Sequence, residues 1–229
     1  MARMDAARPG PARDSTPLHW CTFAIASVLL LGGCTTASRS TADAFRLLLP
    51  RSVEPTREAV ASNRFPQMQV RTSDLASVAV LGYVDGNRQQ WYAGKHGVFE
   101  TDSNGLLLGA SVQVHRWETT IIGQSPFNDL LRLSAPVTVQ RKYDWLDSYQ
   151  LGVMVTGTLS REGIEEIDIL GQKWSLIRLE EHLQGGGMNN RNIYWVDPET
   201  GLIRKSRQFL APNYAVELTQ LKPYRKTQN

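Results

Sequence analysis

The sequence predicts a mostly β protein: a single curved antiparallel meander sheet that closes toward a barrel or half-barrel, with one or two short helices ahead of it. From about Ala76 onward, short apolar or alternating runs are separated by turn residues at close spacing, which is typical of antiparallel strands. No long helical period interrupts these runs, so parallel βαβ units are not expected. Closure of the sheet is favoured because it removes exposed strand edges.

Turn residues divide this region into its expected strands. Asp85-Gly86 and Asn104-Gly105 supply the positive φ of tight hairpins. Gly171, the glycines at 185–187 and the segment 197–201 are interpreted as further turns. The runs between turns predict strands over Ser77–Val84, Gln89–Ala93, Val98–Thr101, Leu106–Leu108, Val137–Trp145, Gly152–Leu159, Glu165–Leu170, Lys173–Glu180, Asn192–Val196, Leu202–Phe209 and Val216–Leu221.

Two short helices are expected before the strands. A helix over 42–49 has Asp43 in its first turn and ends at Pro50. A second helix over 55–62 begins with Pro55, because proline is well placed at the first helical position. Both helices are expected to be accessory to the core.

The N-terminus has the pattern of a secretory leader. An apolar stretch follows an arginine-bearing segment and closes on Leu31-Gly32-Gly33-Cys34, which resembles a bacterial lipobox. Residues 1–33 are therefore expected to be a lipoprotein signal peptide that is removed ahead of Cys34. The apolar run stops at about a dozen residues, short of the roughly 20 that a membrane span needs, and an uncleaved anchor is the alternative. Translation starts at Met1 and at Met4 both remain open.

Cys34 is the mature residue whose chemistry the sequence names. Only Cys21 and Cys34 are present, and Cys21 lies inside the leader, so no disulfide is expected in the mature chain. Cys34 is expected to carry diacylglycerol and palmitate, which anchor the protein to a membrane; no other cofactor is expected. Residues 34–41 form a flexible tether. Thr35 after the cysteine favours the periplasmic face of the outer membrane, by analogy with enterobacterial sorting.

Composition limits the classes of partner. The chain of 229 residues has a formal net charge of +3, and its Lys and Arg are spread among acids, so a nucleic-acid partner is not expected. Residues 42–225 are long enough for a single β-rich domain. Residues 226–229 are expected to form a disordered tail.

The residues that could carry catalysis or metal binding lack the spacing that such chemistry needs. His96, His115 and His182 are far apart and form no motif such as H-E-x-x-H, and no G-x-S-x-G elbow is present. Glu165-Glu166 and Glu180-Glu181 are adjacent pairs, whose members point to opposite faces of a strand. The sequence therefore predicts no catalytic residues and no metal site.

Aromatic side chains are the first candidates for ligand contact. Trp and Tyr rings can stack on sugar rings, although in a β domain they more often anchor the core. In the pairs Trp91-Tyr92 and Tyr194-Trp195, strand alternation places one ring inside and the other outside. Tyr92 and Tyr194, or their neighbours, are the expected exposed members.

The C-terminal half carries a resemblance to a known family. The segments 192–197 and 200–208, then Pro212 and the closing 221–224, resemble the YjbF-type lipoproteins (YjbF/GfcB) of exopolysaccharide and capsule operons. The resemblance covers most of the mature chain, and the lipobox sits where that family has one. It implies an outer-membrane lipoprotein that faces the periplasm, is mostly antiparallel β and takes part in surface polysaccharide secretion. It implies no catalytic residues.

These observations predict a non-enzymatic accessory lipoprotein of exopolysaccharide or capsule export. Its expected partners are the membrane, through the lipid, and exopolysaccharide or proteins of the export machinery. The alternatives are a periplasmic glycan-processing enzyme and a lipid carrier of half-barrel type. Four polar or aromatic residues are expected on two strands of one hairpin, where they either build a groove or pair the strands. The candidate contacts are Tyr92, Tyr194, Asn192, Trp195, Ser206 and Gln208.

Overall fold

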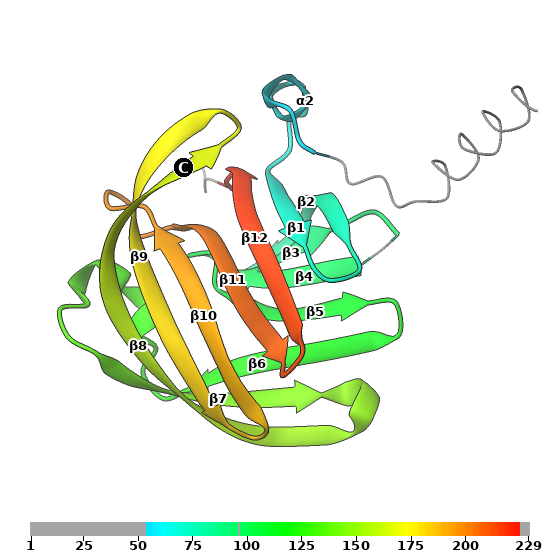
Figure 1. Cartoon of the computed structure of the whole chain (residues 1–229). Helices are drawn as coiled ribbons and strands as arrows, with labels where there is room; N and C mark the ends of the chain where they lie inside the picture. The colour runs from blue at the N-terminus through cyan, green and yellow to red at the C-terminus, as the bar shows by residue number, and fades with distance from the viewer. Residues whose placement is uncertain (1–53, 96, 225–229) are drawn as a thin grey trace, which may run out of the picture. The chain divides into compact units, whose positions relative to one another are not determined.

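The structure is a closed antiparallel barrel of twelve strands (Figure 1). This computed structural model describes residues 54–95 and 97–224. Each strand pairs with the next along the chain, and β1 pairs with β12 to complete the ring. The prediction of a mostly β meander that closes on itself is confirmed. The leader, Cys34, the tether, the helix expected over 42–49, His96 and the tail 226–229 lie outside the described residues.

The described elements follow the order of the chain. Within residues 54–95 and 97–224, no helix has the length and apolarity that a bilayer span requires. The elements are α2 (Arg57–Ser62), β1 (Gln67–Arg71), β2 (Ala76–Asp85), β3 (Arg88–Tyr92), β4 (Gly97–Asp102), β5 (Leu107–Val112), β6 (His115–Ile122), the 3-10 turns η1 (Pro126–Asn128) and η2 (Leu130–Arg132), β7 (Val137–Trp145), the 3-10 turn η3 (Leu146–Ser148), β8 (Gln150–Ile169), β9 (Gln172–Gly185), β10 (Met188–Val196), β11 (Ile203–Ala211) and β12 (Tyr214–Lys222).

Two strands and one strand junction were not predicted, and β5, β9 and β10 extend several residues beyond their expected bounds. β1 and β6 were not predicted, because each is short or rich in polar residues and lacks a run of apolar ones. The strands expected over 152–159 and 165–170 are a single strand, β8, with a register shift next to Gly163. The glycine there has a φ of 143°, so the apparent break is a bulge within one continuous strand.

Helix α2 begins two residues later than expected, at Arg57. The Thr56 side chain accepts a hydrogen bond from the backbone N–H of Ala59 at 3.2 Å. Thr56 is therefore the N-cap, and Pro55 lies ahead of the cap instead of at the first helical position.

The hairpin turns divide between two ends of the barrel. At one end, the β4–β5 turn and the connection 123–136 meet: the Asn104 side chain donates to the carbonyl of Phe127 at 3.1 Å, and Ile203 N donates to the carbonyl of Asn104 at 2.8 Å. We call this the closed end. The described chain also begins and finishes there, since β1 starts and β12 stops at that end (Figure 1). The opposite end, which carries the β1–β2, β5–β6, β7–β8, β9–β10 and β11–β12 turns, is called the mouth.

The barrel interior is filled by side chains in two apolar clusters. The cluster toward the mouth includes Trp91, Phe99 and Trp145, and the cluster toward the closed end includes Phe127 and Leu159. Both arise from strand alternation, which turns every second residue inward. The volume that a carried lipid would occupy is thus taken by side chains in the described barrel, which gives no support to the lipid-carrier alternative.

The β8–β9 hairpin continues beyond the barrel wall as a two-stranded ribbon. Pairing between β7 and β8 stops at Leu159, whereas β8 and β9 remain paired to Ile169 and Gln172. The ribbon rises past the other strands toward α2 (Figure 1). Its apolar residues, together with Trp195 of β10, form a third and smaller cluster. Arg57 of α2 donates to the carbonyl of Leu170 at the ribbon tip at 2.8 Å.

Candidate functional site

The barrel mouth contains a hollow of about 680 Å³. It lies among the turns and strand ends of five hairpins, so its lining comes from positions distant in sequence. We call it the mouth hollow. Aromatic and polar side chains line it together, among them Asp74, His115, Trp117, Asp147, Asn213 and Tyr214.

Three stacked rings form one wall of the mouth hollow. The Trp117 ring lies 4.2 Å from the ring of Tyr214 and 5.2 Å from that of His115, centroid to centroid, and is nearly parallel to both. Trp117 is 6% exposed, whereas His115 is exposed and Tyr214 is half-buried. The central indole thus fixes the two outer rings, which keep surface available to a ligand.

Trp145 supports this stack from the neighbouring strand. It is the register partner of Trp117 across β6 and β7. Its indole N–H donates to the carbonyl of Leu210 at 2.7 Å, which satisfies its polar atom while the ring remains buried. The inner end of the mouth hollow is therefore rigid.

Two carboxylates lie at the rim beside the outer rings. His115 Nδ1 is 2.7 Å from Asp147 Oδ2. Asp74 Oδ1 accepts from Thr72 Oγ1 at 2.8 Å and from the Tyr214 hydroxyl at 3.3 Å. Burial raises the pKa of Tyr214 to about 12, so its hydroxyl stays protonated and donates. The site combines flat apolar surfaces with fixed hydrogen-bond acceptors, which is the composition of a ligand pocket.

The residues expected to contact glycan lie elsewhere, and one of them is buried where exposure was predicted. Tyr194 is 0% exposed, so the expectation that it faces solvent is wrong. Its hydroxyl donates to Glu181 Oε2 at 2.6 Å. Strand alternation turns Tyr194 inward and Trp195 outward, and the hydrogen bond to Glu181 satisfies the buried hydroxyl.

Tyr194 belongs to a buried polar network between the two apolar clusters. Arg141 donates to both oxygens of Glu181 at 2.7 and 2.8 Å, and the Asn192 side chain donates to the same carboxylate at 3.0 Å. Burial would lower the pKa of Arg141, but the Glu181 carboxylate holds it well above the ordinary value. Burial and the same carboxylate raise the pKa of Tyr194 well above its usual range. Gly157 lies opposite, with no side chain to crowd Glu181.

The other inward-facing residues of the predicted hairpin form hydrogen bonds that join neighbouring strands. Asn192 Oδ1 accepts from Phe209 N at 2.8 Å. Gln208 donates to Ser206 Oγ at 2.9 Å and accepts from Leu107 N at 3.3 Å. These three side chains are 1 to 2% exposed. They are on two adjacent strands, as expected, but they form no groove at the surface.

Tyr92 and Trp195 lie on the outer wall of the barrel, apart from the mouth hollow. Tyr92 is 42% exposed, and its ring covers Gly82, where a Cβ would come within 2.6 Å of it. The Trp195 indole donates to Glu165 Oε2 at 2.9 Å, and the Lys205 ammonium sits 5.1 Å from its ring centroid. Tyr92 therefore keeps an available ring, and Trp195 is largely engaged by its neighbours.

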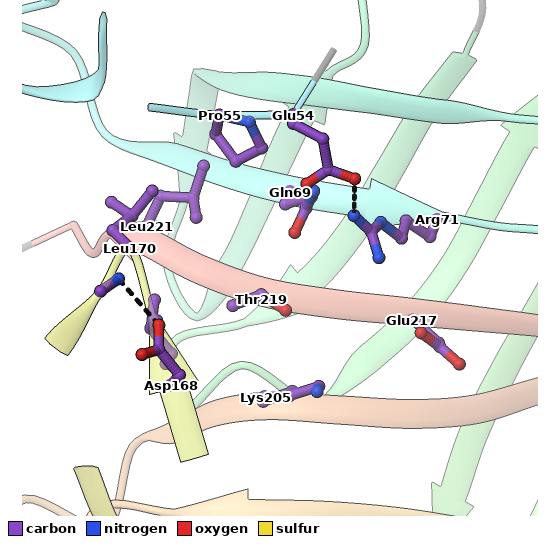
Figure 2. A pocket seen from close by; sticks show the side chains of 12 residues that line it. Glu54, Pro55, Gln69, Arg71, Asp168, Leu170, Lys205, Glu217, Thr219 and Leu221 are labelled. Atoms are coloured by element: carbon purple, nitrogen blue, oxygen red, sulfur yellow. Dashed lines mark hydrogen bonds and ion pairs between the residues drawn. The ribbon is translucent and has the colours of Figure 1, made fainter. Parts of the chain in front are cut away.

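A second recess lies on the outer wall, between the ribbon tip and strands β1, β11 and β12. Figure 2 shows this wall cleft of about 340 Å³. Its charged groups already have partners: Arg71 pairs with Glu54, and Asp168 accepts from Gly171 N at 2.7 Å. Without an exposed ring and with its charges engaged, the wall cleft is a weaker candidate than the mouth hollow.

Sequence reasoning did not identify the mouth hollow. Asp74, Asp147 and Tyr214 follow or precede turns and belong to no motif, and Trp117 lies in a strand that was not predicted. The one local signal is the alternation of His115 with Trp117 just after a turn, which places both rings on a strand end. Among the residues that the structure describes, no cluster of three or more His, Cys, Asp or Glu side chains has the arrangement of a metal site.

The fold and the mouth hollow define a class: a closed antiparallel barrel with a packed interior and a ligand-sized recess at one end. The family model described as "Group 4 capsule polysaccharide lipoprotein gfcB, YjbF" matches residues 37–221. The chain belongs to this family, and the resemblance seen in the sequence is confirmed.

A protein sequence and a solved structure, both from Escherichia coli K12, are similar to the chain. The lipoprotein GfcB is 26% identical over 202 residues, which cover 85% of this chain and 94% of GfcB. The crystal structure of the hypothetical lipoprotein YmcC superposes with a TM-score of 0.64 at 25% identity, covering 80% of this chain and 96% of that one. Both relatives are named as lipoproteins, and neither name states a catalytic activity.

Proposed function

We propose that the protein is a lipid-anchored accessory factor of capsule or exopolysaccharide production, which binds a segment of the glycan in the mouth hollow without cleaving it. Its family is named for a capsule polysaccharide lipoprotein. The lipid would be carried by Cys34, and the protein would face the periplasm from the outer membrane. Contact with proteins of the export machinery would occur on other surfaces of the barrel.

The ring stack at the mouth is the observation that carries this proposal. One face of a hexose ring presents C–H groups, which pack on aromatic rings, while its hydroxyls need hydrogen-bond acceptors and donors at the edge. The rings of Tyr214 and His115 supply such surfaces, and Asp74, Asp147 and Asn213 line the same hollow. The Trp117 indole, 6% exposed, holds both outer rings in place before any ligand arrives.

Binding of the host's own polysaccharide tests the proposal. Tyr214→Ala in the detergent-solubilised lipoprotein is expected to weaken the affinity for fragments of that polysaccharide at least tenfold, about 1.4 kcal/mol, because it removes an outer ring of the stack. Tyr92→Ala is the matched control, since it removes an exposed tyrosine from the outer wall. Equal loss in both variants, or loss only in Tyr92→Ala, contradicts a site at the mouth.

Two further measurements test the remaining parts of the proposal. Incubation of the protein with the polysaccharide should release no new reducing ends, and any turnover would favour the glycan-processing alternative, for which the His115 and Asp147 pair offers the first candidate residues. Metabolic labelling with palmitate should mark the wild-type protein and not Cys34→Ala. Equal labelling of the two would refute the anchor.

A further inference from the structure

The charge of the mouth hollow is one-sided. Its lining includes the carboxylates of Asp74 and Asp147, and none of its lining residues is a lysine or an arginine. His115 is the one other ionisable side chain of the lining besides Tyr214, and its Nδ1 lies against Asp147. A recess that takes anionic groups usually presents arginine or lysine to them. This recess presents the opposite sign.

Each carboxylate also retains an oxygen for a ligand. Asp74 binds Thr72 and Tyr214 through Oδ1, and Asp147 contacts His115 through Oδ2. In the part of the chain that the structure describes, the side-chain hydrogen bonds leave Asp74 Oδ2 and Asp147 Oδ1 without a donor. An ionised carboxylate is an acceptor only, so these solvent-exposed oxygens are available to hydroxyl or amide N–H donors of a ligand in place of water.

From this geometry we infer that the mouth hollow selects uncharged sugar units, such as a neutral hexose or an N-acetylhexosamine, and rejects sugars that carry a carboxylate. The inference rests on the proposed function and specifies its ligand. The apolar face of such a sugar covers the ring of Tyr214 or His115, and its hydroxyl or amide protons satisfy the two carboxylates. A uronate in the same place adds a third negative charge beside them.

The selectivity has a predictable size and salt dependence. Two like charges a few ångströms from a ligand carboxylate, in a recess open to solvent, weaken binding roughly tenfold at low salt. Screening reduces this discrimination as ionic strength rises, because the Debye length falls from about 10 Å at 0.1 M to about 3 Å at 1 M. Selectivity that rests on shape alone would not change with salt.

Two chemically matched forms of one polysaccharide test the inference. Fragments of the host's own polysaccharide are prepared with all carboxylates reduced to alcohols, and a second portion is oxidised at its primary alcohols to carboxylates. The full lipoprotein in detergent is expected to bind the reduced form about tenfold more tightly than the oxidised form at low salt. Equal or tighter binding of the oxidised form overturns the inference. If Tyr214→Ala still abolishes that binding, the proposed function survives; if neither form binds, the glycan proposal fails with it.

Variants that each remove one negative charge from the mouth hollow test whether charge or shape causes the discrimination. Asp74→Asn and Asp147→Asn keep the size of each side chain and are each expected to reduce the discrimination about threefold, since each removes one repelling charge. Asp85→Asn is the control, because Asp85 is exposed at the closed end of β2. Circular dichroism and thermal melting establish that the variants are folded. Unchanged discrimination in both folded mouth variants overturns the inference.

Discussion

At the scale of single residues, the mouth presents an exposed aromatic side chain, Tyr149, on the left-handed backbone that ends the 3-10 turn η3. Tyr149 has a φ of 55° and is 92% exposed, and it lies between Ser148 and Gln150, which both line the mouth hollow. A left-handed conformation costs a bulky residue about 1–2 kcal/mol. The turn accounts for this backbone conformation, and the exposure of the ring beside the recess makes Tyr149 a candidate for contact with a ligand.

Replacement of Tyr149 tests this interpretation. Tyr149→Gly is expected to change the free energy of unfolding by less than about 1 kcal/mol, because relief of strain offsets the backbone entropy that glycine adds. The same variant should weaken glycan binding several-fold. Urea unfolding and equilibrium binding measure the two effects. A loss of stability above about 2 kcal/mol with unchanged binding would assign Tyr149 a structural role.

Asp102 gives a pH dependence whose sign is fixed by its burial. Burial raises the pKa of Asp102 to about 6, although the N–H groups of Leu106 and Asn104 hydrogen-bond to it. The folded protein therefore holds this proton more tightly than the unfolded chain. The contribution of Asp102 to the free energy of unfolding, up to about 3 kcal/mol, is fully present below pH 4 and is lost as the pH rises to 6.

The variant Asp102→Asn isolates this contribution. The amide oxygen of the asparagine in this variant still accepts from both N–H groups, but the side chain has no titrating proton. The stability of the variant should therefore lack the pH-dependent contribution of Asp102. Urea unfolding of both proteins from pH 4 to 6.5 gives the difference curve. Wild type should lose stability relative to Asp102→Asn as the pH rises. A flat difference, or one of opposite slope, would contradict the account.

At the scale of elements, the sequence predicted a strand correctly where apolar and polar residues alternate along it. The bounds of β7 were predicted at both ends, because apolar and polar residues alternate along Val137–Trp145 everywhere except at Arg141. In contrast, β6 contains Trp117, Thr119 and Ile121 with polar residues between them, and its strand character depends on pairing with β5 and β7. β8 looked like two strands because a bulge at Gly163 interrupts the alternation.

The ribbon is an element held by few contacts, and Arg57 is one of them. Arg57 donates to the carbonyl of Leu170 through Nε at 3.2 Å and through a terminal nitrogen at 2.8 Å. Arg57→Ala should accelerate amide exchange at the ribbon tip while the melting temperature changes by only a few degrees, since the contact is exposed and lies outside the barrel core. Arg161→Ala, an exposed arginine of β8, is the control. Unchanged exchange at the tip would show that the small apolar cluster alone holds it.

At the scale of the whole molecule, closure was predicted, but the strand pair that closes the barrel and the buried network were beyond sequence reasoning for the same reason. The pairing of β1 with β12 joins opposite ends of the domain, and local patterns carry no information about such register. Tyr214 and Asp74, which meet at the mouth, are 140 positions apart. Arg141 and Glu181 each resemble an ordinary surface charge in the sequence, although they are 1% and 0% exposed. The family resemblance indicated the association with capsule polysaccharide, and the structure located the mouth hollow.

The network that joins the two halves of the core predicts a strong asymmetry between single and double variants. Arg141→Met leaves the Glu181 carboxylate buried without its partner and should destabilise the barrel by about 3–5 kcal/mol. Adding Glu181→Met should restore much of that stability, because no buried charge remains. Urea unfolding measures both variants. A double variant no more stable than Arg141→Met would contradict the claim that the unpaired buried carboxylate causes the loss of stability.

The most direct test of the central claim, that the mouth binds glycan, is a hydrogen–deuterium exchange footprint of the full lipoprotein with and without fragments of the host polysaccharide. Slower exchange is expected at the mouth turns, over 72–75, 113–116, 146–150 and 212–214, and no change is expected at the closed end or around Tyr92. Protection confined to the outer wall, to the wall cleft or to the closed end would contradict it, as would no protection at a saturating concentration of fragments.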